Sequence, residues 1–238
     1  MKHTFIHLLC FATLSLSLLS CTKEGNGIEE PTGGLKEVED ICTQMEDITF
    51  RNFCYENFDT DKDGKVSMTE ADAVSQIKVF ALGIESLTGI EYFTNLTALN
   101  CNFNKLSSLD VSKCTNLTEL NCSSNELVSL NVSNCTHLNV LDCHSNQLTS
   151  LDVSGCADLV TLGCQKNELT SLNVNGCVNL ETLRCYHNKL TTLDVSTCAN
   201  LSTLDCSDNP LTILYVHPHA PWFSIKYPQG VEIESKGM

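Results

Sequence analysis

The segment DTDKDGKVSMTE, residues 59–70, carries the residue types in this chain that are best suited to chemistry. Carboxylates alternate along its first half, so Asp59, Asp61 and Asp63 can converge on one hard cation. A glycine at position 64 permits the sharp turn that follows these acids. The expected oxygen ligands of one Ca²⁺ are Asp59, Asp61, Asp63, the backbone carbonyl of Lys65, Ser67 and Glu70.

This spacing matches the pattern D-x-[DN]-x-[DN]-G-x5-E at every specified position, and the segment resembles an EF-hand loop. Apolar Ile41, Met45, Ile48 and Phe53 suit an entering helix, and residues 69–77 suit a short leaving helix. EF-hands usually occur in pairs, and we find no second loop. We therefore expect a structural calcium site in an N-terminal helical cap, residues 37–78. The alternatives are a regulatory site and a solvated acidic loop.

The 15 cysteines of the chain raise a second kind of chemistry, because thiols form disulfides, bind metals or pack as small apolar groups. Their spacing is periodic, with a step of 21 residues that leucines and asparagines share. The columns are Leu99, Leu120, Leu141, Leu162, Leu183 and Leu204; Cys101, Cys122, Cys143, Cys164, Cys185 and Cys206; Asn104, Asn125, Asn146, Asn167, Asn188 and Asn209; and Cys114, Cys135, Cys156, Cys177 and Cys198.

The repeated unit, L-x-x-L-x-C-x-x-N-x-L-x-x-L-[DN]-V-[SN]-x-C, closely resembles the leucine-rich repeat family. The resemblance implies a mainly β solenoid over residues 79–216, with a parallel concave sheet and little or no convex helix. A degenerate first coil begins at about residue 82. Its expected inward side chains are Leu82, Ile84, Leu87, Ile90 and Phe93. The proline-rich segment 217–238 is expected to close the other end as a C-terminal cap.

The repeat gives each column an expected position. Alternation along a short strand directs Leu99 and Cys101 inward, so we interpret the cysteine columns as stacked reduced core residues. Disulfides stay open as the alternative, because an exported chain meets an oxidising compartment. The cysteine spacings match no zinc motif. Asn104 and its equivalents are expected to bond the backbone of the neighbouring coil, and Asp110 and Asn131 begin a column in which charged and neutral residues alternate.

The N-terminus has the composition of an export signal. Residues 1–20 combine a lysine with an apolar run, which predicts a signal peptide rather than a membrane-spanning helix. The sequence LLSC resembles the lipobox of bacterial lipoproteins, which implies a lipid on Cys21. A polar, flexible tether follows over residues 21–36 and resembles those of Bacteroidetes-type surface lipoproteins. We therefore expect an exported protein, lipid-anchored to the outer membrane at the cell surface, with simple secretion as the alternative.

The chain carries no catalytic motif that we can identify, so we do not expect an enzyme. Its net charge of -15 argues against nucleic acid and against binding to anionic lipid, which leaves the lipid anchor as the expected membrane contact. We expect a cell-surface binding module whose rigid concave face meets a protein or glycan partner. The alternative is a structural spacer without a dedicated ligand.

Exposed strand positions vary from coil to coil while the buried columns stay fixed, which favours binding over a spacer, although drift at unconstrained sites would look the same. Cationic, titratable and aromatic residues gather in neighbouring coils, flanked by Asp142 and Asp205. This predicted concave patch, suited to an anionic or sugar-rich partner, consists of His144, Lys166, Arg184, Tyr186 and His187.

Overall fold

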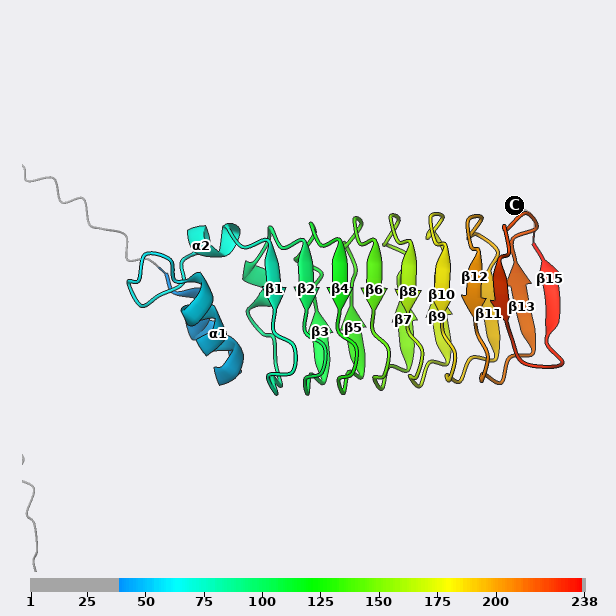
Figure 1. Ribbon diagram of the computed structural model, residues 1–238, viewed down its shortest axis with the longest axis horizontal. Coiled ribbons are helices and arrows are strands. Elements are labelled where there is room, and N and C mark those ends of the chain that lie inside the picture. Colours follow the sequence, from blue (N-terminus) through cyan, green and yellow to red (C-terminus); the bar gives the residue numbers. More distant parts are fainter. Residues whose placement is uncertain (1–38, 237–238) are drawn as a thin grey trace, which may run out of the picture. The chain divides into compact units, whose positions relative to one another are not determined.

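The computed structural model describes residues 39–236, drawn in colour in Figure 1. The predicted signal peptide, Cys21 and the tether lie outside the described residues. Over residues 39–236, no helix has both the length and the apolar content needed to cross a membrane.

Eight parallel strands form one continuous sheet along the solenoid (Figure 1). Leu99 pairs in register with Leu120, and Leu120 with Leu141, so the 21-residue period of the sequence is the period of the strands. In sheet order the strands are β1 (Gln76–Lys78), β2 (Ala98–Asn100), β4 (Glu119–Asn121), β6 (Val140–Asp142), β8 (Thr161–Gly163), β10 (Thr182–Arg184), β12 (Thr203–Asp205) and β14 (Ser224–Lys226).

The return path of each coil also contains a short strand. These strands form three separate parallel sheets: β3 (Ser108–Asp110) with β5 (Ser129–Asn131); β7 (Ser150–Asp152) with β9 (Ser171–Asn173); and β11 (Thr192–Val195) with β13 (Ile213–Val216) and β15 (Glu232–Ser235). From residue 93 to residue 236 the chain contains no helix. The fold is therefore mainly β, a parallel-strand solenoid of about eight turns without convex helices, as predicted.

The breaks between these three sheets coincide with the column in which aspartate and asparagine alternate, which consists of Asp110, Asn131, Asp152, Asn173 and Asp194. The Asn131 amide donates to the carboxylate of Asp110 at 3.0 Å, and Asn173 donates to Asp152 at 3.1 Å. Each bonded pair joins two strands, and the sheet breaks after the asparagine. Although partial burial opposes it, hydrogen bonds from Ser112 and Asn131 lower the pKa of Asp110. Between β3 and β9, alternation thus replaces repulsion between neighbouring carboxylates with a hydrogen bond from an amide, and the short sheets there repeat every two coils.

The two cysteine columns lie inside the solenoid. All 13 cysteines of the described chain are buried and free. Thiols of the second column reach carbonyls of the preceding coil; Cys135 approaches Val111 at 3.4 Å and Cys177 approaches Val153 at 3.2 Å. Burial raises the pKa of Cys101 to about 12, so this thiol stays protonated at neutral pH. The inward, packed position of the repeat cysteines is confirmed.

A column of six buried asparagines closes the turns after β2, β4, β6, β8, β10 and β12 of the large sheet. The side chain of Asn146 accepts from the Leu127 amide at 3.0 Å and donates to the carbonyls of Cys122 and Cys143 at 3.1 and 3.0 Å. Two of these three groups belong to the preceding coil. Each asparagine therefore joins its own turn to its neighbour, as the sequence predicted, and satisfies backbone groups that cannot reach water.

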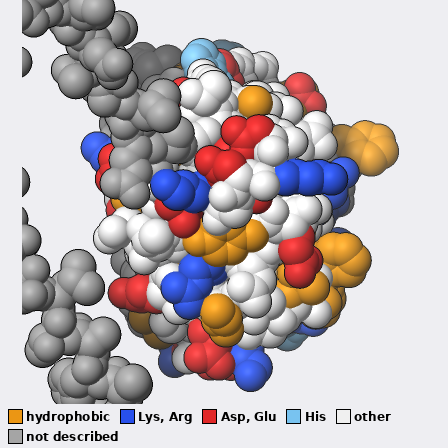
Figure 2. All heavy atoms as spheres, turned by 90° about the vertical axis from the view of Figure 1, so that its left-hand side faces the viewer, with side chains coloured by type: hydrophobic (Ala, Val, Ile, Leu, Met, Phe, Trp, Pro, Cys, Tyr) orange, Lys and Arg blue, Asp and Glu red, His pale blue; other side chains and the backbone are white. Residues whose placement is uncertain are grey.

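The N-terminal cap begins with η1 (Ile41–Gln44) and α1 (Ile48–Phe58), continues with α2 (Met68–Asp72), and is followed in the first coil by η2 (Ile90–Tyr92). The Phe58 ring lies 5.4 Å from that of Phe93, so α1 packs on the first coil. Figure 2 shows acidic, basic and hydrophobic side chains intermixed on this end. The apolar interior of the first coil is therefore covered by a largely polar cap.

Three sequence predictions in the cap and the first coil need correction. The entering helix is shorter than expected, because Ile41 lies in η1 and Met45 at its end. The leaving helix ends at Asp72, because residues 76–78 pair with β2 as the first strand of the sheet. Leu82 is 44% exposed rather than inward-facing. Gln76 on β1 pairs with Ala98 on β2, one residue further along the chain than the 21-residue repeat that joins Ala98 to Glu119. This extra residue places Leu82 in the turn.

At the other end the chain continues the solenoid. In the segment expected to form the C-terminal cap, β14 extends the large sheet and β15 extends the three-stranded sheet. Residues 217–236 therefore add a further coil at this end, because both strands alternate polar and apolar residues despite the prolines around them.

Candidate functional site

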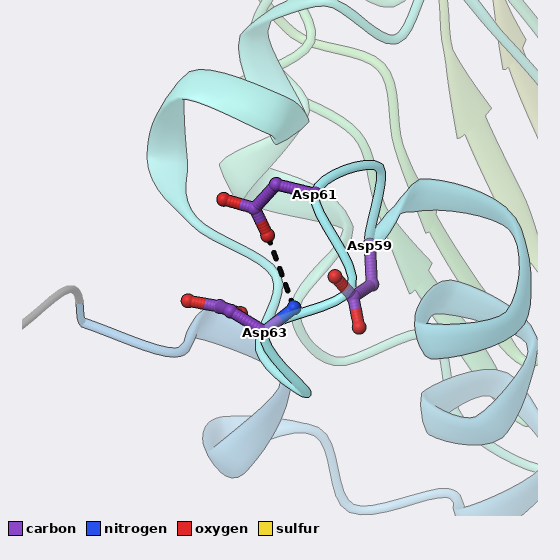
Figure 3. A group of neighbouring side chains, drawn as sticks. All are labelled: Asp59, Asp61 and Asp63. Carbon is purple, nitrogen blue, oxygen red and sulfur yellow. Dashed lines mark hydrogen bonds between the residues drawn. The ribbon is translucent and has the colours of Figure 1, made fainter.

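The acidic loop joins α1 to α2, and its three aspartates lie together (Figure 3). One carboxylate oxygen from each of Asp59, Asp61 and Asp63 lies within 4.8 Å of the others. The loop backbone folds around its own acids: the Asp63 amide donates to Asp61 at 3.1 Å, and the Gly64 amide donates to Asp59 at 3.0 Å. Gly64 has a φ of 84°, the left-handed conformation that glycine adopts without strain.

The donor set fits a hard cation. Asp59 Oδ1 is buried and has no hydrogen-bond partner among the described residues. A carboxylate oxygen cannot become a donor at neutral pH, so this atom needs a donor or a cation to offset its burial. Oxygen ligands from alternating carboxylates are the kind that Ca²⁺ prefers. The buried, unpartnered oxygen therefore favours the calcium site over the solvated acidic loop.

Glu70 closes the loop from the first turn of α2. Its carboxylate accepts from the Ser67 amide at 2.9 Å and, across the loop, from the Thr60 amide at 2.6 Å. Ser67 Oγ in turn accepts from the Glu70 amide, which completes a capping box. Hydrogen bonds from Ser67 and Thr60 lower the pKa of Glu70 to about 2, so its carboxylate is ionised at neutral pH. Glu70 is thus held in the charged form and within reach of the loop that would carry the cation.

The loop is also fixed from outside. The backbone of Val66 donates to the Asp40 carboxylate at 3.2 Å and accepts from the Ile41 amide at 3.0 Å. Lys65, the expected carbonyl ligand, is the residue before Val66 in this bonded stretch. Contacts within the cap therefore hold the loop in place. The sequence contains no second EF-hand-like loop with which this one could pair. This arrangement suits a structural site better than a sensor.

The residues of the predicted concave patch lie at the large sheet, but they form two groups. Tyr186 and His187 are in edge contact at 5.4 Å between ring centroids, and His187 Nδ1 lies 3.4 Å from Asp208. His144 instead bonds the Asp142 carboxylate of its own coil at 2.6 Å. The structure therefore separates His144 from the other aromatic groups of the patch.

Arg184 is the one member of the predicted patch that lies within a strand, and two of the others are turn residues. Lys166 and His187 have φ values of 57° and 53°, in a column of left-handed residues just before each buried asparagine. The Lys166 amide donates to the Tyr186 carbonyl at 2.9 Å, so these neighbouring turns are joined. Arg184 lies on β10, in register with Gly163 on one side and Asp205 on the other. Over residues 39–236, Arg184 makes no ion pair, because Asp205 bonds Lys226 instead.

A feature that the sequence reasoning missed is a depression of about 300 Å³ over the first four strands of the sheet. The small residue Ala98 lies in its lining, which is both apolar, with Leu99 and Val140, and polar. Its outward-facing lining includes Lys78, Asn100, Glu119, Asn121 and Asp142. The sequence signal for such a depression is a small residue, Ala98, paired with the larger Gln76 and Glu119 on the two neighbouring strands.

Comparison with known proteins supports the fold. A family model described as Leucine Rich repeats (2 copies) matches residues 178–217. A search of curated proteins finds no match. The chain is similar to internalin C2 of Listeria monocytogenes, at 20% identity and a TM-score of 0.53, covering 82% of this chain and 99% of that one. With the strand topology above, these matches define a leucine-rich-repeat fold.

Two further solved structures are similar over part of their length. The functional domain of InlJ from Listeria monocytogenes, described as including a cysteine ladder, is 25% identical with a TM-score of 0.49. The match covers 80% of this chain and 54% of that domain. A leucine-rich-repeat protein of Leptospira interrogans is 23% identical with a TM-score of 0.48, covering 63% of this chain and 46% of that one. This chain thus spans about half the length of each.

Proposed function

We propose that this protein is a non-enzymatic binding module of the cell surface, whose large sheet presents a rigid face to a protein or glycan partner. The observation that carries the proposal is the contrast between the two sides of each strand. Inward positions repeat leucine and cysteine, whereas one row of outward positions carries five different residue types over the eight strands. That row, here called the sheet face, is Lys78, Asn100, Asn121, Asp142, Gly163, Arg184, Asp205 and Lys226.

Chemistry and rigidity support a binding role for the sheet face. Backbone hydrogen bonds between parallel strands fix the outward side chains, which lowers the entropy cost of ordering them on binding. Arg184, on the sheet face, and Tyr186, two residues beyond it in the same coil, are residue types enriched at binding hot spots. Arg184 carries a guanidinium that no carboxylate neutralises among residues 39–236. It is suited to a bidentate contact with a carboxylate, phosphate or sulfate on the partner.

The calcium loop has a structural role in this proposal. One Ca²⁺ held by Asp59, Asp61, Asp63, the Lys65 carbonyl, Ser67 and Glu70 offsets the charge of the loop. The cation fixes the connection between α1 and α2, and so the cap that covers the first coil.

The proposed location is the outer membrane, through a lipid on Cys21. Replacement of Cys21 by serine removes the acylation site, so we expect the protein to move from the detergent-rich phase to the aqueous phase in a phase-separation assay. Unchanged partitioning of the variant would contradict the anchor and would leave secretion or another membrane contact.

A binding screen tests the proposed function. The soluble chain that begins after Cys21 is used as bait on a glycan array and in a pull-down from cell-surface extracts. We expect at least one ligand that binds the parent chain and is lost from a variant carrying both Arg184→Ala and Tyr186→Ala. Ligands held equally by parent and variant would place binding away from Arg184 and the adjacent Tyr186. No ligand in either format would favour the spacer.

A further inference from the structure

One carboxylate in the N-terminal cap connects three segments of the chain. Asp40 lies just before η1 and accepts hydrogen bonds through both of its oxygens. Asp40 Oδ1 accepts from the Cys42 amide at 3.0 Å and from the Val66 amide at 3.2 Å. Asp40 Oδ2 accepts from the hydroxyl of Tyr55, on α1, at 2.6 Å. This residue therefore joins η1, α1 and the acidic loop, although it lies well before the loop in the sequence.

The contact with Val66 uses both backbone groups of that residue. Besides donating to Asp40, Val66 accepts from the Ile41 amide at 3.0 Å through its carbonyl. Val66 is 0% exposed, so water cannot take the place of either bond. Without the Asp40 carboxylate, the Val66 amide would be buried without a partner, or the backbone of the loop would have to shift.

The peptide unit between Lys65 and Val66 transmits this contact to the loop. A peptide unit is planar, and in its trans form the N–H and the C=O point in opposite directions. The Val66 N–H points to Asp40, so the Lys65 carbonyl is directed away from Asp40. That carbonyl is the backbone ligand expected at the proposed calcium site. A hydrogen bond from the N–H to a carboxylate also polarises the peptide unit, which makes its carbonyl oxygen a stronger acceptor.

The other oxygen of Asp40 is held by α1. Burial, followed by the hydrogen bond to Asp40, raises the pKa of the Tyr55 hydroxyl, so this group is protonated and donates at neutral pH. Because one oxygen is bonded to α1, the carboxylate cannot turn away from Val66 without breaking a second bond. The orientation of Asp40 is therefore fixed before any cation binds.

We propose that Asp40 is a positioning residue of the calcium loop. Its carboxylate sets the direction of the Lys65 carbonyl through the Val66 amide, and so raises the affinity of the loop for Ca²⁺, although Asp40 is not one of the expected ligands. The inference rests on the proposed calcium site. It has a reciprocal consequence, because a contact that favours calcium binding is itself favoured by bound calcium. Calcium should therefore stabilise the attachment of η1 to the loop.

Calcium titrations of the full chain by isothermal titration calorimetry test this role. Asp40→Ala should raise the dissociation constant by roughly 10–100-fold, the usual effect of removing a group that orients a metal ligand. Asp40→Asn keeps an oxygen that can accept from the Val66 amide, so it should recover most of the affinity lost in Asp40→Ala. Glu39→Gln, which removes the charge of the neighbouring exposed acid, should bind calcium as the parent does.

Two further measurements separate calcium affinity from stability. Tyr55→Phe removes the bond to the other Asp40 oxygen. It should lower the melting temperature of the calcium-free protein but change the dissociation constant much less than Asp40→Ala does. The second measurement needs no substitution. In the parent chain, the Cys42 and Val66 amides should exchange with deuterium at least about tenfold more slowly in saturating calcium than in chelator.

The failure of this inference differs from the failure of the calcium site. A parent chain that binds no Ca²⁺ would refute the site, and the positioning role with it. Calcium binding by the parent with an unchanged dissociation constant in Asp40→Ala would overturn the positioning role alone. Asp40→Asn or Glu39→Gln binding as weakly as Asp40→Ala would overturn it as well, because charge and not the hydrogen bond would then set the affinity. Exchange of the Cys42 and Val66 amides that does not depend on calcium would also contradict it.

Discussion

Replacement of Asn146 by alanine should lower the free energy of unfolding by about 3 kcal/mol, although it removes only a few atoms. The Asn146 side chain holds the Leu127 amide and the Cys122 and Cys143 carbonyls, and it is 8% exposed. Alanine leaves these groups buried without a partner, at a cost of about 1–3 kcal/mol for each unsatisfied group. The loss should appear in urea unfolding as a lower midpoint with an unchanged slope.

An exposed asparagine in the same repeat provides the matched control. Asn179 donates one hydrogen bond, to the Ala157 carbonyl, from the surface of its coil. Asn179→Ala should change the free energy of unfolding by at most about 0.5 kcal/mol. Equal effects of the two substitutions would mean that the buried asparagine column does not join the coils as described.

Calcium should raise the stability of the cap by about 2.7 kcal/mol when its concentration is 100 times the dissociation constant, by linkage between binding and folding. Asp59 Oδ1 is the atom that needs this cation most, since it is buried without a partner in the described chain. Scanning calorimetry with calcium and with a chelator measures the shift. Glu70→Gln should reduce it strongly, because the amide removes one charge and one strong acceptor.

The control for this substitution is Glu56→Gln, on the exposed surface of α1 and outside the loop. It should keep the full calcium shift. A protein that melts at the same temperature with calcium and with chelator, or a Glu70→Gln variant that behaves as the parent, would show that the loop is only a solvated acidic segment.

The interior of the solenoid could be predicted from sequence because one period determines many positions at once. The 21-residue step places Leu99, Cys101 and Asn104 relative to one another and to every neighbouring coil. An alternative register would move whole columns of leucine to the surface, so the sequence excludes it. The clustering of Asp59, Asp61 and Asp63 could also be predicted, because these residues alternate along one short segment of the chain.

The ends and the outer surface could not be predicted in the same way. The first coil pairs with an offset of one extra residue, and only the structure reveals that Leu82 consequently faces solvent. The period alone does not give the left-handed turn conformation of Lys166 and His187. Contacts that depend on local folding, such as the hydrogen bond from Tyr55 to Asp40, have no repeated pattern to indicate them.

The measurement that tests the central claim most directly is the affinity of the partner from the screen for three variants, determined by isothermal titration calorimetry. Arg184→Ala and Tyr186→Ala should each weaken binding by about 2 kcal/mol or more with the melting temperature unchanged. Lys113→Ala, an exposed cation on the opposite side of the solenoid, should bind as the parent does. Parental affinity in both sheet variants would contradict the claim that the large sheet is the binding surface.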